Sequence, residues 1–201
     1  MACLPLISCS RKVTLENTLM TEDDVVAITR DWLEKAVIGL NLCPFARSVY
    51  IKEQVRYCVS QARHTDGLLE ELDTELDLLA AADPEKIDTT LLIIPHLLQD
   101  FLDFNDLTAL AEASVVEHEL EGVLQVASFH PQFQFADTEP DAISNYTNRA
   151  PFPIWHLIRE SSLARAVAAY PNPEAIYERN IETLERLGQA GWAALGMRQP
   201  G

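Results

Sequence analysis

Residues 89–95 limit the possible folds of this chain more than any other segment. Two threonines lead into an uninterrupted run of Leu and Ile, which is typical of a strand buried on both faces. Residues 123–129 have the same apolar character, and residues 55–62 alternate apolar and polar side chains as a half-buried or edge strand does. The three segments predict a sheet that is covered by helices.

Helical periodicity fills the gaps between these strands. One helix is marked by Leu68, Leu69, Leu72, Leu76 and Leu79, with Thr65 or Asp66 as its cap, and another covers about residues 100–120. Each connection is long enough for a right-handed crossover, so the three strands should run in the same direction. The predicted fold class is α/β, or α+β, with a small, mainly parallel sheet of three or four strands and about five helices.

Further helices are expected at both ends of the folded part. Thr21 and Asp24 have the spacing of a capping box ahead of an amphipathic helix that ends near Gly39. Asn172-Pro173-Glu174 is typical of a helix start and opens the last helix. Residues 154–159 fit a short helix and a strand equally well.

A chain of 201 residues is expected to form one domain, here over residues 20–195. Residues 1–19 lack apolar periodicity, which indicates a disordered tail or a misassigned start, and residues 196–201 are expected to be a second tail. A signal peptide is the rival interpretation, but the basic pair follows its short apolar stretch instead of preceding it.

The formal charge of −16, with basic residues scattered along the chain, argues against nucleic acid and anionic membranes as partners. No apolar run approaches the roughly 20 residues that cross a bilayer. The four cysteines form no Cys-x-x-Cys pair. We therefore expect a reduced, cytoplasmic location.

The most plausible ligand site begins at His130. This histidine follows the apolar strand at residues 123–129 and leads into residues 132–153, a segment that is rich in amides, aromatics and prolines. If the three strands are parallel, His64, His96 and His130 lie beyond their carboxyl ends at one sheet edge, where ligands collect in such folds. The alternative for each histidine is a hydrogen-bonded loop residue without a ligand.

Other candidate ligand-binding side chains follow in the chain. The amides of Asn145 and Asn148 and the guanidiniums of Arg149 and Arg159 suit a carboxylate or a phosphate. If residues 154–160 are helical, His156 and Glu160 share a face, and the Glu would orient the imidazole. The alternative is that these groups only tie the loop to the body of the protein.

Two other kinds of site are weaker candidates. His130, His156 and Asp137 or Glu160 offer nitrogen and oxygen ligands to a catalytic metal, although no metal-binding motif supports them. Cys43, in Leu42-Cys43-Pro44-Phe45-Ala46, is a candidate redox thiol, but Ala46 stands where a second redox cysteine is expected. A buried structural thiol is the alternative for Cys43.

Three phrases carry a family resemblance: Leu42-Cys43-Pro44-Phe45-Ala46, Ser128-Phe129-His130-Pro131 and Asn145-Tyr146-Thr147-Asn148-Arg149-Ala150-Pro151. In these the chain resembles a bacterial family catalogued as domain of unknown function fourteen-fifteen, over about residues 24–194. The resemblance implies a bacterial cytoplasmic protein. It brings no reaction, substrate or cofactor.

The leading functional hypothesis is an enzyme, or a small-molecule binder, that holds an anionic metabolite through Arg149 and Arg159. His130 would act as acid or base, with Asn145, His156 and Glu160 orienting it. One rival is a protein interaction module without catalytic activity, and another is a thiol-dependent redox protein that uses Cys43. The cofactor and the oligomeric state are left open.

Overall fold

Four strands form one mixed sheet in the computed structural model, which describes residues 20–200. They are β1 (Val55–Val59), β2 (Thr89–Ile93), β3 (Leu124–Phe129) and β4 (Ile154–Arg159), in the spatial order β1-β2-β4-β3. β1 and β2 are parallel, whereas β4 is antiparallel to both of its neighbours. β1, β2 and β3 therefore share one direction, as expected, but only one of the three pairings is parallel because β4 lies between β2 and β3.

β4 resolves the segment that fitted both a helix and a strand. Its residues Ile154, Trp155 and Leu157 are fully buried, and they alternate between the two faces of the sheet. A strand with apolar side chains on both faces loses the most surface to water in the middle of a covered sheet. β4 therefore takes a central position although it comes last in the chain.

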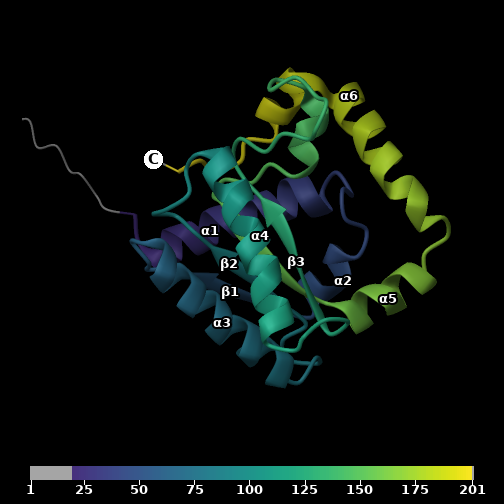
Figure 1. Ribbon diagram of the computed structural model, residues 1–201. Coiled ribbons are helices and arrows are strands. Elements are labelled where there is room, and N and C mark those ends of the chain that lie inside the picture. The colour runs from purple at the N-terminus through teal and green to yellow at the C-terminus, as the bar shows by residue number, and fades with distance from the viewer. Residues whose placement is uncertain (1–19, 201) are drawn as a thin grey trace, which may run out of the picture.

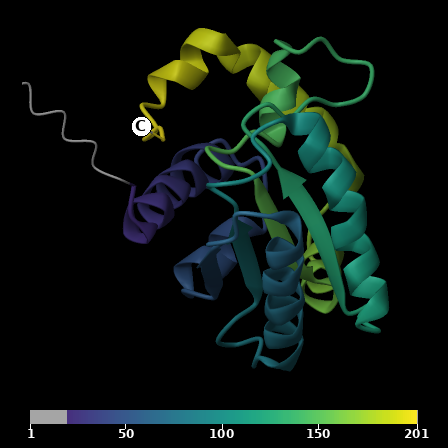
Figure 2. The same cartoon turned by 60° about the vertical axis from the view of Figure 1, so that its left-hand side comes forward.

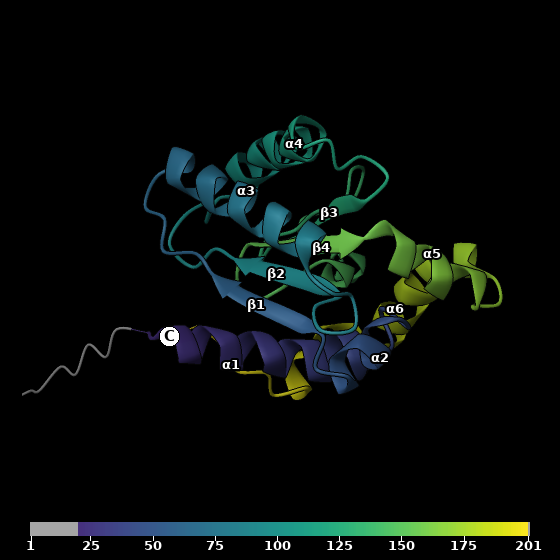
Figure 3. The same cartoon turned by 90° about the horizontal axis from the view of Figure 1, so that it is seen from below.

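Helices cover both faces of the sheet (Figures 1 and 3). α3 (Thr65–Ala81) and α4 (Phe101–Glu117) pack on one face, through Leu68, Leu72 and Phe104 among others. α1 (Glu22–Trp32), continued by a π-helical segment at Leu33–Ile38, packs on the other. The expected layers are confirmed.

Side chains cap the three covering helices. The Thr21–Asp24 capping box of α1 is present, and Asp100 accepts from the first turn of α4. α3 differs from expectation, because His64 is its cap: Nδ1 accepts from the backbone N–H of Gly67 at 3.1 Å. An imidazole acceptor takes the part expected of a hydroxyl or a carboxylate.

The remaining helices lie beside the sheet. α2 (Ala46–Ile51) is a short helix that the sequence pattern did not predict, and α5 (Glu160–Ala168) follows β4 directly. The Asn172-Pro173 signal opens a 3-10 turn, Pro173–Ala175, which leads into α6 (Ile176–Ala194). α6 bends at Gly188, whose φ of 64° is a left-handed value that glycine adopts readily.

The C-terminal residues return to α1 (Figure 2). Trp192, Leu195 and Met197 pack against the apolar cluster on that face of the sheet. Lys35 Nζ donates to the Gly196 carbonyl at 2.7 Å, and the Arg198 backbone N–H donates to Asp31 at 2.8 Å. Residues 196–198 are therefore held against α1, which differs from the expected tail.

A helix that crosses a bilayer is roughly 20 residues long and predominantly apolar. Within residues 20–200, no helix has that combination of length and apolar character.

His118, at the C-terminal end of α4, links this helix to α3. Its Nδ1 lies 2.8 Å from Asp77 and its Nε2 lies 3.3 Å from Asp73. The hydrogen bond to Asp77 is the main cause that raises the pKa of His118, and burial opposes it. The protonated imidazole donates to Asp77, forms an ion pair with Asp73, and so joins the two helices.

We expect His118→Gln to destabilise the protein only when the imidazole is charged. Because folding raises this pKa above its ordinary value of 6.5, the stabilisation is complete below pH 6.5 and disappears as the pH rises through the raised value. In urea unfolding at about pH 5.5, the free energy of unfolding of the variant should be lower than that of the wild type by up to ~1 kcal/mol, as for partly exposed ion pairs. At about pH 8.5 the variant should match the wild type, and an equal loss at both values would contradict this role.

Candidate functional site

The topology brings the carboxyl ends of β1, β2 and β3 to one edge of the sheet, as the sequence analysis expected. Val59 is paired with Ile93, and Ile93 and Phe129 are both paired with Ile154, so these ends form one row. His64, His96 and His130 follow these ends in the chain. Their environments differ, because His96 is exposed, His64 caps α3, and His130 is completely buried.

His130 is held by the backbone through both of its ring nitrogens. The backbone N–H of Gln132 donates to Nδ1 at 3.0 Å, so Nε2 carries the hydrogen that is donated to the Leu98 carbonyl at 3.0 Å. The ring packs against Phe101 and Phe104, with centroids 5.5 and 5.1 Å away. Burial lowers the pKa of His130. The neutral imidazole therefore fastens the loop after β3 to the start of α4.

The two asparagines also hold the loop together. Asn145 is fully buried; its Oδ1 accepts from the Phe135 backbone N–H and the Thr138 hydroxyl, and its Nδ2 donates to the Glu139 carbonyl. Asn148 Nδ2 donates to the Ser128 carbonyl at 3.2 Å. These amides supply the hydrogen bonds that an irregular backbone does not make with itself.

Arg149 and Arg159 lie at opposite ends of the segment that contains β4. Arg149 donates to the carbonyls of Phe133 and Pro140, at 3.2 and 2.5 Å, and its guanidinium stacks 4.4 Å from the Tyr146 ring centre. Arg159 is buried and donates to the carbonyls of Leu79 and Ala82 at the end of α3. Since β4 alone spans roughly 17 Å, the two guanidiniums do not form one anion site.

His156 and Glu160 do not share a helix face, because residues 154–159 form a strand and Glu160 begins α5. His156 lies in the middle of β4, where its Nε2 is 2.7 Å from the hydroxyl of Thr89 on β2. That hydroxyl donates to the Leu157 carbonyl at 2.6 Å, so Nε2 acts as the donor to it. Burial lowers the pKa of His156 to about 4.

The weak metal alternative finds no support in this arrangement. His130 contacts α4 on one side of the sheet, whereas His156 faces Phe129 and Thr89 on the other. Within residues 20–200, no three or more His, Cys, Asp or Glu side chains are grouped so that they would hold a metal ion. His130, His156 and Asp137 are therefore not brought together.

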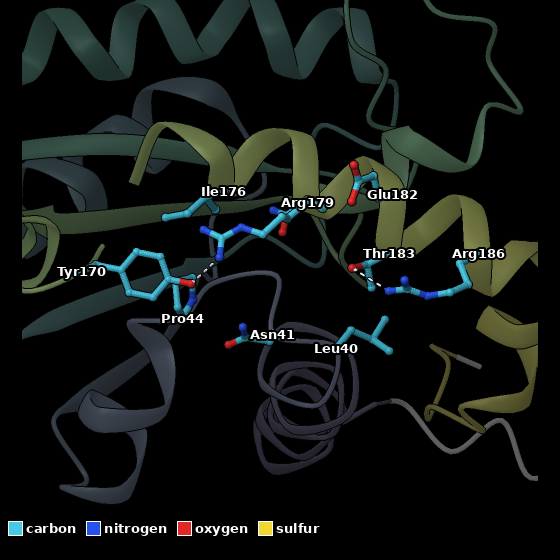
Figure 4. A pocket seen from close by; sticks show the side chains of 10 residues that line it. Leu40, Asn41, Pro44, Tyr170, Ile176, Arg179, Glu182, Thr183 and Arg186 are labelled. Carbon is cyan, nitrogen blue, oxygen red and sulfur yellow. Dashed lines mark hydrogen bonds between the residues drawn. The ribbon is translucent and has the colours of Figure 1, made fainter. Parts of the chain in front are cut away.

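A hollow that the sequence analysis did not predict lies between the loop after α1 and the corner formed by α5 and α6 (Figure 4). Its volume is about 230 Å³. Apolar side chains line one part of it, namely Leu40, Pro44 and Ile176. Polar side chains line the rest, namely Asn41, Tyr170, Arg179, Asn180, Glu182, Thr183 and Arg186.

The two arginines of this hollow are held differently. Arg179 donates to the Tyr170 hydroxyl at 3.0 Å and to the Ala175 carbonyl at 3.1 Å, which fixes the corner before α6. Arg186 makes one long bond, of 3.5 Å, to the Thr183 hydroxyl. Within residues 20–200, no Asp or Glu oxygen lies within 4.0 Å of either guanidinium. Neither positive charge is neutralised by a carboxylate of the described residues, and Arg186 has more free donors than Arg179, which also donates to the Asn172 carbonyl at 3.4 Å.

The walls of the hollow are joined by a buried amide. Asn180, on the inner side of α6, donates to the Leu42 carbonyl at 2.9 Å and so fastens the helix to the loop. Asn41, in the same loop, has a left-handed φ of 56°. The sequence signal for this site is an Arg-x-x-x-Thr-x-x-Arg stripe on α6, which looks like an ordinary solvated helix face until the loop is placed beside it.

A second hollow lies beyond β1, beside the first turn of α3. Its lining includes Arg63 and His64, but also Glu70 and Glu71. The Arg63 guanidinium donates to the Gln61 carbonyl at 3.3 Å. Acidic side chains next to the arginine make this hollow a poorer anion site than the first one.

Cys43 is next to Pro44 at the edge of the first hollow and packs against the apolar cluster on the α1 side of the sheet. Burial raises the pKa of its thiol, although the backbone N–H groups of Phe45 and Ala46 donate to the sulfur. Cys58, on β1, has its pKa raised to about 12, mainly by burial. Both thiols are therefore in their protonated form near neutral pH.

We expect His156 to make the protein sensitive to acid. Its pKa of about 4 in the fold is below the ordinary value of 6.5, so the unfolded chain binds this proton more readily. Stability should fall between pH 6.5 and about 4, by about 3 kcal/mol if the whole shift is realised. His156→Gln keeps a donor to Thr89, and its free energy of unfolding in urea should fall less over this pH range than that of the wild type. An equal loss in both proteins would contradict this assignment.

No curated protein and no solved structure matches this chain. The model of a family described as "Protein of unknown function (DUF1415)" matches residues 24–194. This range contains all three phrases around Cys43, His130 and Arg149 that indicated the same family, and it covers most of the sequence. The chain therefore belongs to the DUF1415 family.

Proposed function

We propose that this protein binds a small anionic molecule in the hollow between the loop at Leu40–Pro44 and α6. The observation that carries the proposal is the pair of guanidiniums, Arg179 and Arg186, without a carboxylate within 4.0 Å in residues 20–200. Guanidinium groups match carboxylate and phosphate oxygens in geometry as well as in charge. An anion would supply the negative charge that both guanidiniums lack and would take the free hydrogen-bond donors of Arg186.

The rest of the lining favours a ligand with one polar and one apolar part. The Thr183 hydroxyl and the Asn41 amide offer further hydrogen bonds beside the arginines, while Leu40 and Ile176 offer an apolar surface. In Figure 4 the Asn41 side chain lies on the loop across the hollow from Arg179 and Arg186, and the Glu182 carboxylate is directed away from it. At about 230 Å³ the hollow is below the usual size of drug-binding pockets, which favours a short carboxylate or phosphate.

Most of the net negative charge of this acidic protein lies outside the segments that line the hollow. Residues 64–122 contain sixteen Asp and Glu and one basic residue, Lys86, whereas the remainder of the chain is almost balanced. The arginines of α6 belong to the balanced part. Repulsion of an anion by the more distant carboxylates is weakened by the salt of the solution.

This proposal keeps the ligand class that the sequence suggested and assigns it to other residues. Arg149 and Arg159 are occupied by backbone carbonyls, while Arg186 has only its long contact with Thr183. The lining of the hollow contains no His or Cys. The proposal is accordingly for binding, and no catalytic step is assigned to His130, His156 or Glu160.

Titration calorimetry with inorganic phosphate and with succinate tests the proposal. We expect Arg186→Gln to weaken binding of the more tightly bound anion by about tenfold or more, because a charge-assisted hydrogen bond is lost. The Tm should not change, because the substitution is on the surface. Arg179→Gln should weaken binding and also lower the Tm, since Arg179 holds the corner before α6.

Arg165→Gln is the matched control, because Arg165 is an exposed arginine on α5 that does not line the hollow. It should leave the affinity unchanged. Affinity that survives Arg186→Gln but is lost in Arg149→Gln would move the site to the loop after β3. Failure of the wild type to bind either anion would contradict the proposal.

The redox alternative is tested through the reactivity of Cys43. Because burial raises its pKa, we expect iodoacetamide at about pH 7.5 to alkylate Cys43 at least about tenfold more slowly in the native protein than in urea. Peptide mapping by mass spectrometry separates Cys43 from the other cysteines. A native thiol that reacts faster than the unfolded one would favour the redox function instead.

A further inference from the structure

α4 is apolar on two opposite sides, and only one of them is covered. Its inner side packs on the sheet through Phe104, Leu107, Ala111 and Val115. A surface helix normally has one apolar stripe, and a helix with apolar residues all round is normally buried. The outer side of α4 therefore needs an explanation.

The outer apolar residues form a stripe, which Asn105 and Asp106 interrupt between Leu102 and Ala109. Leu102, Ala109 and Val116 are spaced by seven residues, with Ala113 between the last two, so they lie on one face of the helix. Leu102 is 70% exposed and Val116 is 52% exposed. In Figure 1, α4 crosses the front of the molecule with no other element over it. The stripe, Leu102–Ala109–Ala113–Val116, has the spacing of a helix–helix seam, with small residues at its centre.

Carboxylates border this stripe on both sides. Asp103, Asp106, Glu112 and Glu117 are exposed on α4, and the helix contains no Lys or Arg. They belong to the segment 64–122, which carries nearly all of the net negative charge. Two copies of α4 packed on each other would place carboxylate against carboxylate, which costs free energy at an interface. The charge thus argues against a second copy of this chain as the occupant.

We propose that the outer stripe of α4 is a docking site for an amphipathic helix of another protein, with an apolar face bordered by Lys and Arg. Its apolar side chains would cover Leu102 and Val116 and pack closely over Ala109 and Ala113. Its cations would face Asp106, Glu112 and Glu117. This surface is on the opposite side of the sheet from α1 and is independent of the proposed anion site.

A designed peptide tests this surface. The probe is a fluorescent helix of about 18 residues with Leu at positions i, i+3, i+4 and i+7 and Lys elsewhere, and its partner probe has Glu in place of every Lys. By fluorescence anisotropy with the full chain, we expect the Leu/Lys peptide to bind and the Leu/Glu peptide not to bind. Binding of both peptides, or of neither, would overturn the proposal.

Matched variants locate the contact. Leu102→Ser and Val116→Ser remove apolar surface without changing charge. Each should weaken binding of the Leu/Lys peptide by about tenfold. Ile51→Ser is the control, because Ile51 on α2 is also 70% exposed and lies away from α4. Equal affinity in all three variants would show attraction to the acidic surface only and would overturn the helix site. A dimer in light scattering that Leu102→Ser converts to a monomer would also overturn the proposal, because the stripe would then bind a second copy of this chain.

Discussion

The insertion of β4 between β2 and β3 is the constraint on which the rest of the structure depends. A simple series of crossovers would make β2 and β3 neighbours, but β4 lies between them and pairs with both. It buries Trp155 and Leu157 on one face of the sheet and Ile154 on the other. It also ends at Arg159, whose guanidinium binds the last carbonyls of α3. Sheet, covering helices and the start of α5 are thus fixed by one short strand.

β3 and β4 are adjacent antiparallel strands that a short hairpin could join, but the long segment from His130 to Pro153 connects them instead. That segment has little regular structure, and its backbone groups are bonded by side chains: His130, Asn145, Asn148 and Arg149 each bind backbone atoms. A buried imidazole or amide without a partner costs free energy, so such groups are placed where they are satisfied. Residue types that suit catalysis serve equally well to order an irregular loop.

Positive groups on α6 and negative groups on α3 and α4 divide the surface into two chemically different regions. α6 presents Arg179 and Arg186 to a small hollow, whereas α4 presents an apolar stripe between carboxylates. One region is suited to a small anion and the other to a cationic protein segment. The proposed anion site and the proposed interaction surface are therefore compatible in this chain, since they use opposite sides of the sheet.

Periodicity and capping signals determined much of the fold from the sequence alone: the strands at residues 55–59, 89–93 and 124–129, the helices between them and the Thr21–Asp24 cap of α1. These are local signals, because each depends on side chains within one or two turns. The place of β4, the cap on α3 by Arg159 and the hollow beside Arg186 were decided by tertiary structure. Each of them joins residues far apart in the chain, and a guanidinium has the same sequence pattern whether its partner is a carbonyl, water or a ligand.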